Sequence, residues 1–117
     1  MSEEEQRNFV KRFYEALDAG DAETASALFP DGTVIHLWDG TTFHTQAEFR
    51  AWFTELRSTS ENAKREVTKF AVDGNVAHVE VVLHANHNGE PRVVRLTHEF
   101  HFEGDHLVEV TVRIDPL

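Results

Sequence analysis

Residues 76–100 decide the fold: they read VAHVEVVLHANHNGEPRVVRLTHEF and encode two strands joined by a tight turn. Asn88-Gly89 is a strong signal for a two-residue type I′ hairpin turn. One face of this hairpin is almost wholly apolar, with Ala77, Val79, Val81, Leu83 and Ala85 opposite Phe100, His98, Leu96, Val94 and Arg92. This face is therefore predicted to form the core side of a sheet, with His98 as the polar residue at its centre.

Two further hairpins flank this one, and each needs a bulge to keep its apolar residues on the core side. A turn at Asp73-Gly74 would point Val67 and Arg65 outward, whereas a one-residue bulge near Thr68-Lys69 turns them back. An odd loop or bulge at Gly104-Asp105 aligns the apolar residues of the last strand with the inward row, namely Val108, Val110, Val112 and Ile114. Bulges bend sheets, so we predict a strongly curved antiparallel sheet with an interior.

The first half of the chain has the spacing of helices. Phe9, Phe13 and Leu17 recur at intervals of four residues, which is typical of the buried face of a helix. We predict a helix that begins near Ser2 and ends at Gly20, a second from Asp21 to Pro30, a short hairpin over Thr33–His44, a third helix capped by Thr45, and a polar loop from Ser58 to Asn62. Helices followed by strands define an α+β fold, and 117 residues make one domain spanning 1–117.

Composition narrows the class of partner. The chain has 21 Asp and Glu against 11 Lys and Arg, and its formal charge of -10 repels nucleic acids and anionic membranes. It has no cysteine, which excludes disulfides and zinc–thiolate sites. The sequence starts with the acidic stretch 1–5, unlike a signal peptide, and holds no membrane-length apolar run. We expect a soluble protein without a targeting signal, cytoplasmic when expressed recombinantly.

Four polar residues are predicted to face the interior or its edge. Tyr14 and Asp18 are four residues apart on the first helix, so they lie on one side of it. Asp18 is in the last turn, where the helix dipole disfavours an anion, and Arg65 is the cation best placed to compensate. Tyr14 and His98 form a second natural pair. The alternative interpretation gives each residue an ordinary role, as a core-edge tyrosine, a solvated helix end, an outward arginine and a satisfied core histidine.

The histidines do not form a convincing metal site. His98 and His101 are three residues apart on a strand, so they point to opposite faces. The outward row contains several possible ligands, namely His78, Glu80, His84, Glu99 and His101. We interpret this row as a solvated sheet face and expect no bound metal.

The order of helices, short hairpin, helix and long strands resembles the cone-shaped NTF2-like fold. The resemblance is carried by FYEALDAGDAETASALF (13–29) and DGTVIHLWDGTTFHTQAEFRAWF (31–53). Over essentially all 117 positions the chain also resembles luciferases designed de novo on idealised NTF2-like scaffolds, most closely at IHLWDG (35–40), LHANHNG (83–89) and the strand around His98.

This resemblance implies an enzyme that oxidises a synthetic imidazopyrazinone luciferin, such as diphenylterazine, with molecular oxygen and emits light. It implies no cofactor, with oxygen as co-substrate, and functional pairs at Tyr14–His98 and Asp18–Arg65. Arg65 would stabilise the anionic luciferin, and His98, with a pKa suited to proton transfer, would help to move the proton. The substrate-binding wall and mouth would comprise Trp38, Leu56, Ser60, Val81, Leu83, Leu96, Phe100, Val110 and Val112.

Two other functions stay open. The same fold supports a small-molecule binder that performs no chemistry, and it supports proton transfer on a steroid-like substrate. The predicted inward faces of the strands offer no Asp or Glu as a base, which weighs against the second. The charged outer row favours a monomer over a dimer formed through the sheet.

Overall fold

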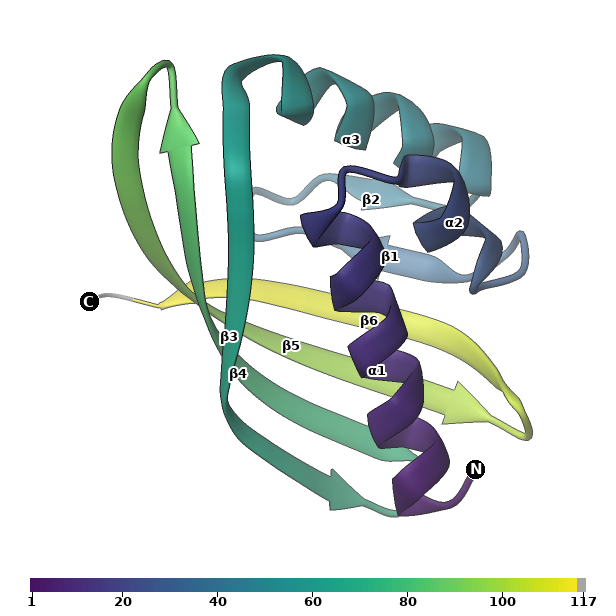
Figure 1. The fold of residues 1–117 in the computed structure, drawn as a ribbon. Helices are drawn as coiled ribbons and strands as arrows, with labels where there is room; N and C mark the ends of the chain where they lie inside the picture. The colour runs from purple at the N-terminus through teal and green to yellow at the C-terminus, as the bar shows by residue number, and fades with distance from the viewer. Residues whose placement is uncertain (116–117) are drawn as a thin grey trace.

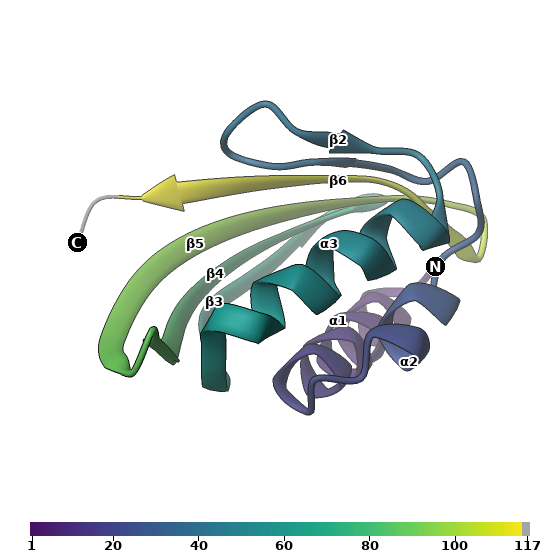
Figure 2. The ribbon, with the colours of Figure 1, turned by 90° about the horizontal axis from the view of Figure 1, so that it is seen from above.

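The computed structural model describes residues 1–115 as three helices and six strands in one sheet (Figure 1). The elements are α1 (Glu3–Asp18), α2 (Ala22–Ala27), β1 (Val34–His36), β2 (Thr42–Phe43), α3 (Gln46–Thr59), β3 (Ser60–Asp73), β4 (Val76–His87), β5 (Glu90–Glu103) and β6 (His106–Asp115). Seen from above, the sheet bends around the helices, which all lie on its concave side (Figure 2). The α+β architecture predicted from the sequence is therefore confirmed.

The helices begin where the sequence provides caps. The Ser2 hydroxyl accepts a hydrogen bond from the backbone N–H of Glu5, and the Glu5 carboxylate accepts one from the N–H of Ser2. This reciprocal pair satisfies two donors that the first turn of α1 would otherwise leave free. Asp21 caps α2 and Thr45 caps α3 in the same way, each accepting from the N–H three residues later. The predicted helix starts are confirmed.

The central hairpin has the predicted register. Val79 pairs with His98 and Val81 with Leu96 across β4 and β5. Bulges are present in both flanking hairpins, as register shifts at Thr68 in β3 and at Val108 in β6. They keep the apolar residues of the outer strands on the concave side, where the core lies.

Three local predictions are wrong. The turn between β3 and β4 is Gly74-Asn75, because Asp73 still pairs with Val76. Leu107 rather than Val108 takes the inward position in β6, since the bulge leaves Val108 without a partner there. The polar loop over 58–62 does not exist, because α3 runs to Thr59 and β3 starts at Ser60. Asn62, with a φ of 55°, instead accompanies a second bulge within β3.

The sheet is mixed rather than wholly antiparallel, in the order β2-β1-β6-β5-β4-β3. β1 runs parallel to β6, with Ile35 opposite Val110. The two strands are separated in sequence by α3 and three long strands, so no hairpin sets their direction. The pairing is fixed by packing instead: the Thr33 hydroxyl donates to the Leu107 carbonyl at 2.8 Å, and Ile35 and Val110 are both buried.

Candidate functional site

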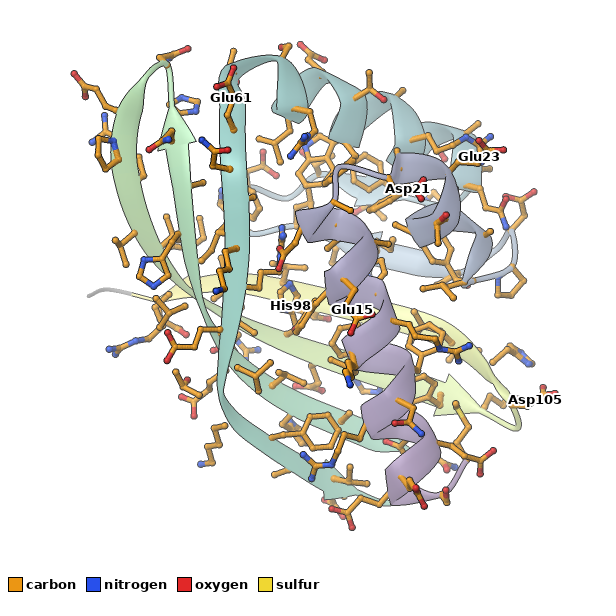
Figure 3. The ribbon with its side chains drawn as sticks, in the orientation of Figure 1. Glu15, Asp21, Glu23, Glu61, His98 and Asp105 are labelled. Atoms are coloured by element: carbon orange, nitrogen blue, oxygen red, sulfur yellow. The ribbon has the colours of Figure 1, made fainter. Side chains whose placement is uncertain are left out.

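The first polar pair joins α1 to the middle of β5. The Tyr14 hydroxyl lies 2.7 Å from Nδ1 of His98, and both side chains are buried. The hydroxyl has no other hydrogen-bond partner within residues 1–115, and a buried hydroxyl without an acceptor is costly. Tyr14 therefore donates to Nδ1, and the neutral imidazole carries its proton on Nε2. Figure 3 shows His98 between the sheet and α1, whereas Glu61, Glu23 and Asp105 lie at the periphery.

Burial fixes the charge state of this pair. Desolvation, and to a lesser extent the nearby Arg65 cation, lowers the pKa of His98 to about 3. Desolvation likewise raises the pKa of Tyr14. Both groups are therefore neutral at pH 7. This corrects the expectation that the pKa of His98 suits proton transfer near neutrality: His98 acts there as a hydrogen-bonding group and not as a resident cation.

The second polar pair joins the last turn of α1 to β3. Nη1 of Arg65 lies 2.6 Å from Oδ1 of Asp18, and the Arg65 backbone N–H donates to Oδ2 at 3.0 Å. The Asp18 carboxylate thus binds both the backbone and the side chain of Arg65, which fixes the position of the guanidinium. The Arg65 side chain is only 8% exposed, and its Nε–H is buried with no partner among residues 1–115. An unused donor on a buried cation is rare in folded proteins.

The concave side of the sheet and the helices enclose an apolar cavity of about 190 Å³. The lining residues are, in chain order, Phe13, Leu17, Ile35, Leu37, Trp38, Phe49, Trp52, Phe53, Leu56, Ser60, Arg65, Leu83, Val94, Leu96, His98, Val110, Val112 and Ile114. Arg65 and His98 are the charged or ionisable groups in this lining. The cavity therefore combines aromatic and aliphatic walls with a few polar groups, as small-molecule sites do.

Seven of the nine positions expected in the substrate wall and mouth line this cavity, namely Trp38, Leu56, Ser60, Leu83, Leu96, Val110 and Val112. Val81 and Phe100 do not line it, and both are fully buried. Phe100 packs instead against Phe13 and Tyr14, with ring centroids 6.1 and 6.2 Å apart. These two residues belong to the core.

The four predicted polar residues are divided between two hollows. Arg65 and His98 line the cavity, whereas Tyr14 and Asp18 line a separate outer groove of about 250 Å³ between α1 and β3. Arg65 borders both hollows. Tyr14 and Asp18 are thus positioning residues: each lies outside the cavity and is hydrogen-bonded to the residue that lines it, Tyr14 to His98 and Asp18 to Arg65. The sequence paired these residues but gave no sign of this division.

Sequence reasoning missed much of the helical wall. Phe49, Trp52 and Phe53 line the cavity from α3, and Phe13 and Leu17 from α1. Their helical periodicity marked them as apolar and inward, which is the same signal that marks ordinary core residues. Only the tertiary structure separates the part of an apolar face that fills space from the part that borders a void.

Lowering the pH is expected to destabilise the fold through His98. An unfolded chain takes up a proton on this imidazole near pH 6.5, whereas the folded chain does so only near pH 3. Stability contributed by the neutral form is therefore lost as the pH falls through this window, by up to about 1.4 kcal/mol per pH unit. The measurement is urea unfolding between pH 7.5 and pH 4, comparing the protein with His98→Gln, which should lack this slope.

His78→Gln is the matched control, because His78 lies on the outer face and is half exposed. It should keep the pH dependence of the starting protein. Parallel curves for His98→Gln and the starting protein would contradict the assignment of a neutral, buried imidazole.

No three His, Asp or Glu side chains within residues 1–115 are grouped so that they could hold a metal ion. None of the helices over the same residues combines the length and apolar character that crossing a membrane requires.

The fold and the cavity define a class: an α+β domain whose curved sheet and helices surround an apolar cavity holding a few polar groups. The SnoaL-like domain family model matches residues 10–110. The chain therefore belongs to the SnoaL-like domain family, and the NTF2-like fold expected from the sequence is confirmed.

Solved structures agree on the fold. An NTF2-like protein of unknown function from Burkholderia pseudomallei superposes with a TM-score of 0.86 at 20% identity, covering 98% of this chain and 92% of that one. A putative polyketide cyclase from Xanthomonas campestris pv. campestris gives 0.83 at 19% identity, with 97% and 93% coverage. A hypothetical protein with a ketosteroid isomerase-like fold from Catenulispora acidiphila, in complex with trimethylamine, gives 0.81 at 17% identity, with 89% and 82% coverage. No curated protein sequence matches the chain.

Proposed function

We propose that this chain is a cofactor-independent luciferase, of the kind designed de novo on idealised NTF2-like scaffolds, that acts as a monomer on an imidazopyrazinone luciferin such as diphenylterazine. The observation that carries the proposal is the Arg65 guanidinium, which is held by Asp18 at the wall of an apolar cavity with its Nε–H unused. A fixed cation in a dry cavity stabilises an anionic substrate far more than the same cation in water.

The reaction is an oxidative decarboxylation with oxygen as the oxidant. The luciferin loses a proton to solvent, and its anion bonds to O₂ at the carbon next to the carbonyl. The terminal peroxide oxygen then adds to that carbonyl, and the bond from the carbonyl carbon to the ring nitrogen breaks with its electron pair going to nitrogen, which leaves a dioxetanone. Its O–O and C–C bonds then break. One oxygen atom of O₂ leaves in CO₂ and the other becomes the amide carbonyl of the excited product, which emits light. This sequence requires neither metal nor flavin.

Each polar residue has a role that follows from its position. Arg65 donates to the oxygen on which the luciferin anion carries its charge. Asp18 holds the guanidinium so that it needs no reorganisation as the anion forms. His98, neutral and donating through Nε2–H, binds an acceptor atom of the heterocycle, and Tyr14 fixes the tautomer that makes this donation possible.

The apolar wall supports the light-emitting step. Aromatic side chains of α1 and α3, such as Phe13, Phe49 and Phe53, line the cavity and leave water few polar partners there. Dry surroundings strengthen the interaction of Arg65 with an anion and protect an excited product from quenching by solvent.

The direct test is light emission. Purified protein mixed with diphenylterazine in air, with a chelator present, should emit light well above the protein-free mixture, consume oxygen and release CO₂. The same mixture under nitrogen should stay dark. Absence of emission and of oxygen uptake across a panel of imidazopyrazinones would overturn the proposal.

A second candidate is a small-molecule binder that performs no chemistry. A protein of similar fold from Catenulispora acidiphila was solved in complex with trimethylamine, and the present chain has an apolar cavity with two ionisable groups in its lining. This function predicts that a ligand is recovered unchanged and that no oxygen is consumed. A steroid isomerase is supported less, because the cavity lining within residues 1–115 contains no carboxylate to act as a base; turnover of a 5-ene-3-ketosteroid would favour it.

A further inference from the structure

The cavity has a closed end and an open mouth, which differ in exposure. At the closed end Phe49, Phe53 and Val110 are almost fully buried. At the mouth Trp38 and Ile114 are 47% and 45% exposed, although both line the cavity. Figure 1 shows the β1–β2 connection and the end of β6, which carry these two residues, on the same side of the molecule as the β4–β5 hairpin. Large apolar side chains exposed together at a cavity mouth are typical of a binding surface.

The backbone beneath Trp38 is firmly held. The N–H of Leu37 donates to the carbonyl of Thr41 at 2.8 Å, and the N–H of Gly40 donates to the carbonyl of Leu37 at 3.2 Å. The Asp39 carboxylate closes the same turn by accepting from the N–H of Thr41 at 2.9 Å. Trp38 is therefore part of a turn whose backbone is held by three hydrogen bonds.

The indole of Trp38 also lacks an internal partner. Trp52, the other tryptophan, packs against Phe43, Phe49 and Phe53. Within residues 1–115 Trp38 has no aromatic ring or cation in stacking range. A ring of this size that is exposed, positioned and unpaired is available to stack on a ligand.

The size of the cavity indicates what the ligand must do. Pockets that enclose drug-sized molecules have volumes of roughly 300–1,000 Å³, whereas this cavity measures about 190 Å³. A triaryl-sized heterocycle therefore cannot be enclosed completely, and part of it must extend through the mouth.

We propose that Trp38 and Ile114 form a rim that binds a flat aryl arm projecting from the cavity, and so select ligands with an extended aromatic substituent over the bare heterocycle. The choice of ligand rests on the proposed function, which this inference deepens. Arg65 and His98 bind the polar centre inside, while the rim recognises a part of the ligand that takes no part in the chemistry.

The test measures binding without turnover. Under nitrogen, the anisotropy of ligand fluorescence gives Kd for diphenylterazine and for the same heterocycle without aryl substituents. Trp38→Ala should weaken diphenylterazine about tenfold and Ile114→Ala about threefold, while both change the bare heterocycle by less than about twofold. Trp38→Phe should recover most of the loss. In air, Trp38→Ala should raise KM with kcat almost unchanged.

Val93→Ala is the matched control, since Val93 is 44% exposed but does not line the cavity, and it should change neither Kd. Equal losses of affinity for the two ligands in Trp38→Ala, or no loss for either, would contradict the proposed rim. A selective loss of affinity for diphenylterazine in a protein that emits no light would contradict the luciferase activity and support the rim. Light emission with an unchanged KM in Trp38→Ala would contradict the rim and support the luciferase activity. If neither ligand binds the starting protein, both proposals are wrong.

Discussion

Replacing Arg65 with methionine is expected to lower kcat/KM for light emission about 100- to 1,000-fold, the loss typical of removing one donor to a developing anion. Methionine retains much of the apolar stem and removes the guanidinium of a residue that lines the cavity. The initial rate of light emission, measured at several luciferin concentrations, gives kcat/KM. The kcat/KM of Arg65→Lys should lie between the values of the starting protein and Arg65→Met, because lysine keeps the charge but loses the rigid donor geometry.

Two companion variants make the Arg65 result interpretable. Arg95→Met removes an exposed cation from the opposite face of the same sheet and should leave emission unchanged. Asp18→Asn combined with Arg65→Met avoids an unpaired carboxylate at the end of α1, so it keeps the experiment meaningful if Arg65→Met alone folds poorly. Full emission from a folded variant without Arg65 would exclude this residue from the mechanism.

Replacing Phe100 with alanine is expected to lower the free energy of unfolding by about 3–5 kcal/mol. Phe100 is completely buried, and its ring packs edge-to-face against Phe13 and lies against Tyr14 and His98. The loss combines the transfer of the ring to water with the void that the ring leaves in the core. Urea unfolding followed by circular dichroism measures it. Because domains are stable by only about 5–15 kcal/mol, this loss is a large fraction of the total.

Val93→Thr is the control for Phe100, on the same strand. Val93 is exposed, and threonine keeps its branched shape, so the change in stability should stay within about 0.5 kcal/mol. A loss of unfolding free energy below about 1 kcal/mol in Phe100→Ala would show that the surrounding side chains move to fill the void, and that Phe100 is not a principal core contact.

The parts of the fold set by neighbours in sequence could be predicted. The Asn88-Gly89 turn set the register of β4 against β5, and the serine, aspartate and threonine caps set the starts of the three helices. Arg65 could be assigned to the inward face because a straight continuation of β3 would have turned Val67 and Arg65 to the outer face and other charged residues inward. Each of these outcomes depends on backbone geometry over a few residues.

The chemistry of the site could be predicted only in part, because pairing does not reveal surroundings. That Tyr14 meets His98 and Asp18 meets Arg65 follows from residue types that complement one another on facing elements. Tyr14 and Asp18 line the outer groove and not the cavity, and this depends on how closely α1 approaches β3. The low pKa of His98 depends on how completely the surrounding side chains exclude water.

By itself the sequence determined the order of the elements, the facing of the long strands and the two polar pairs, since periodicity, caps and turns act between residues close along the chain. The tertiary structure alone decided that β1 lies parallel to β6, that Val81 and Phe100 belong to the core, and that a void remains. The physical reason is that direction of a distant strand, solvent exclusion and unfilled volume are properties of the whole packed assembly, to which every element contributes at once.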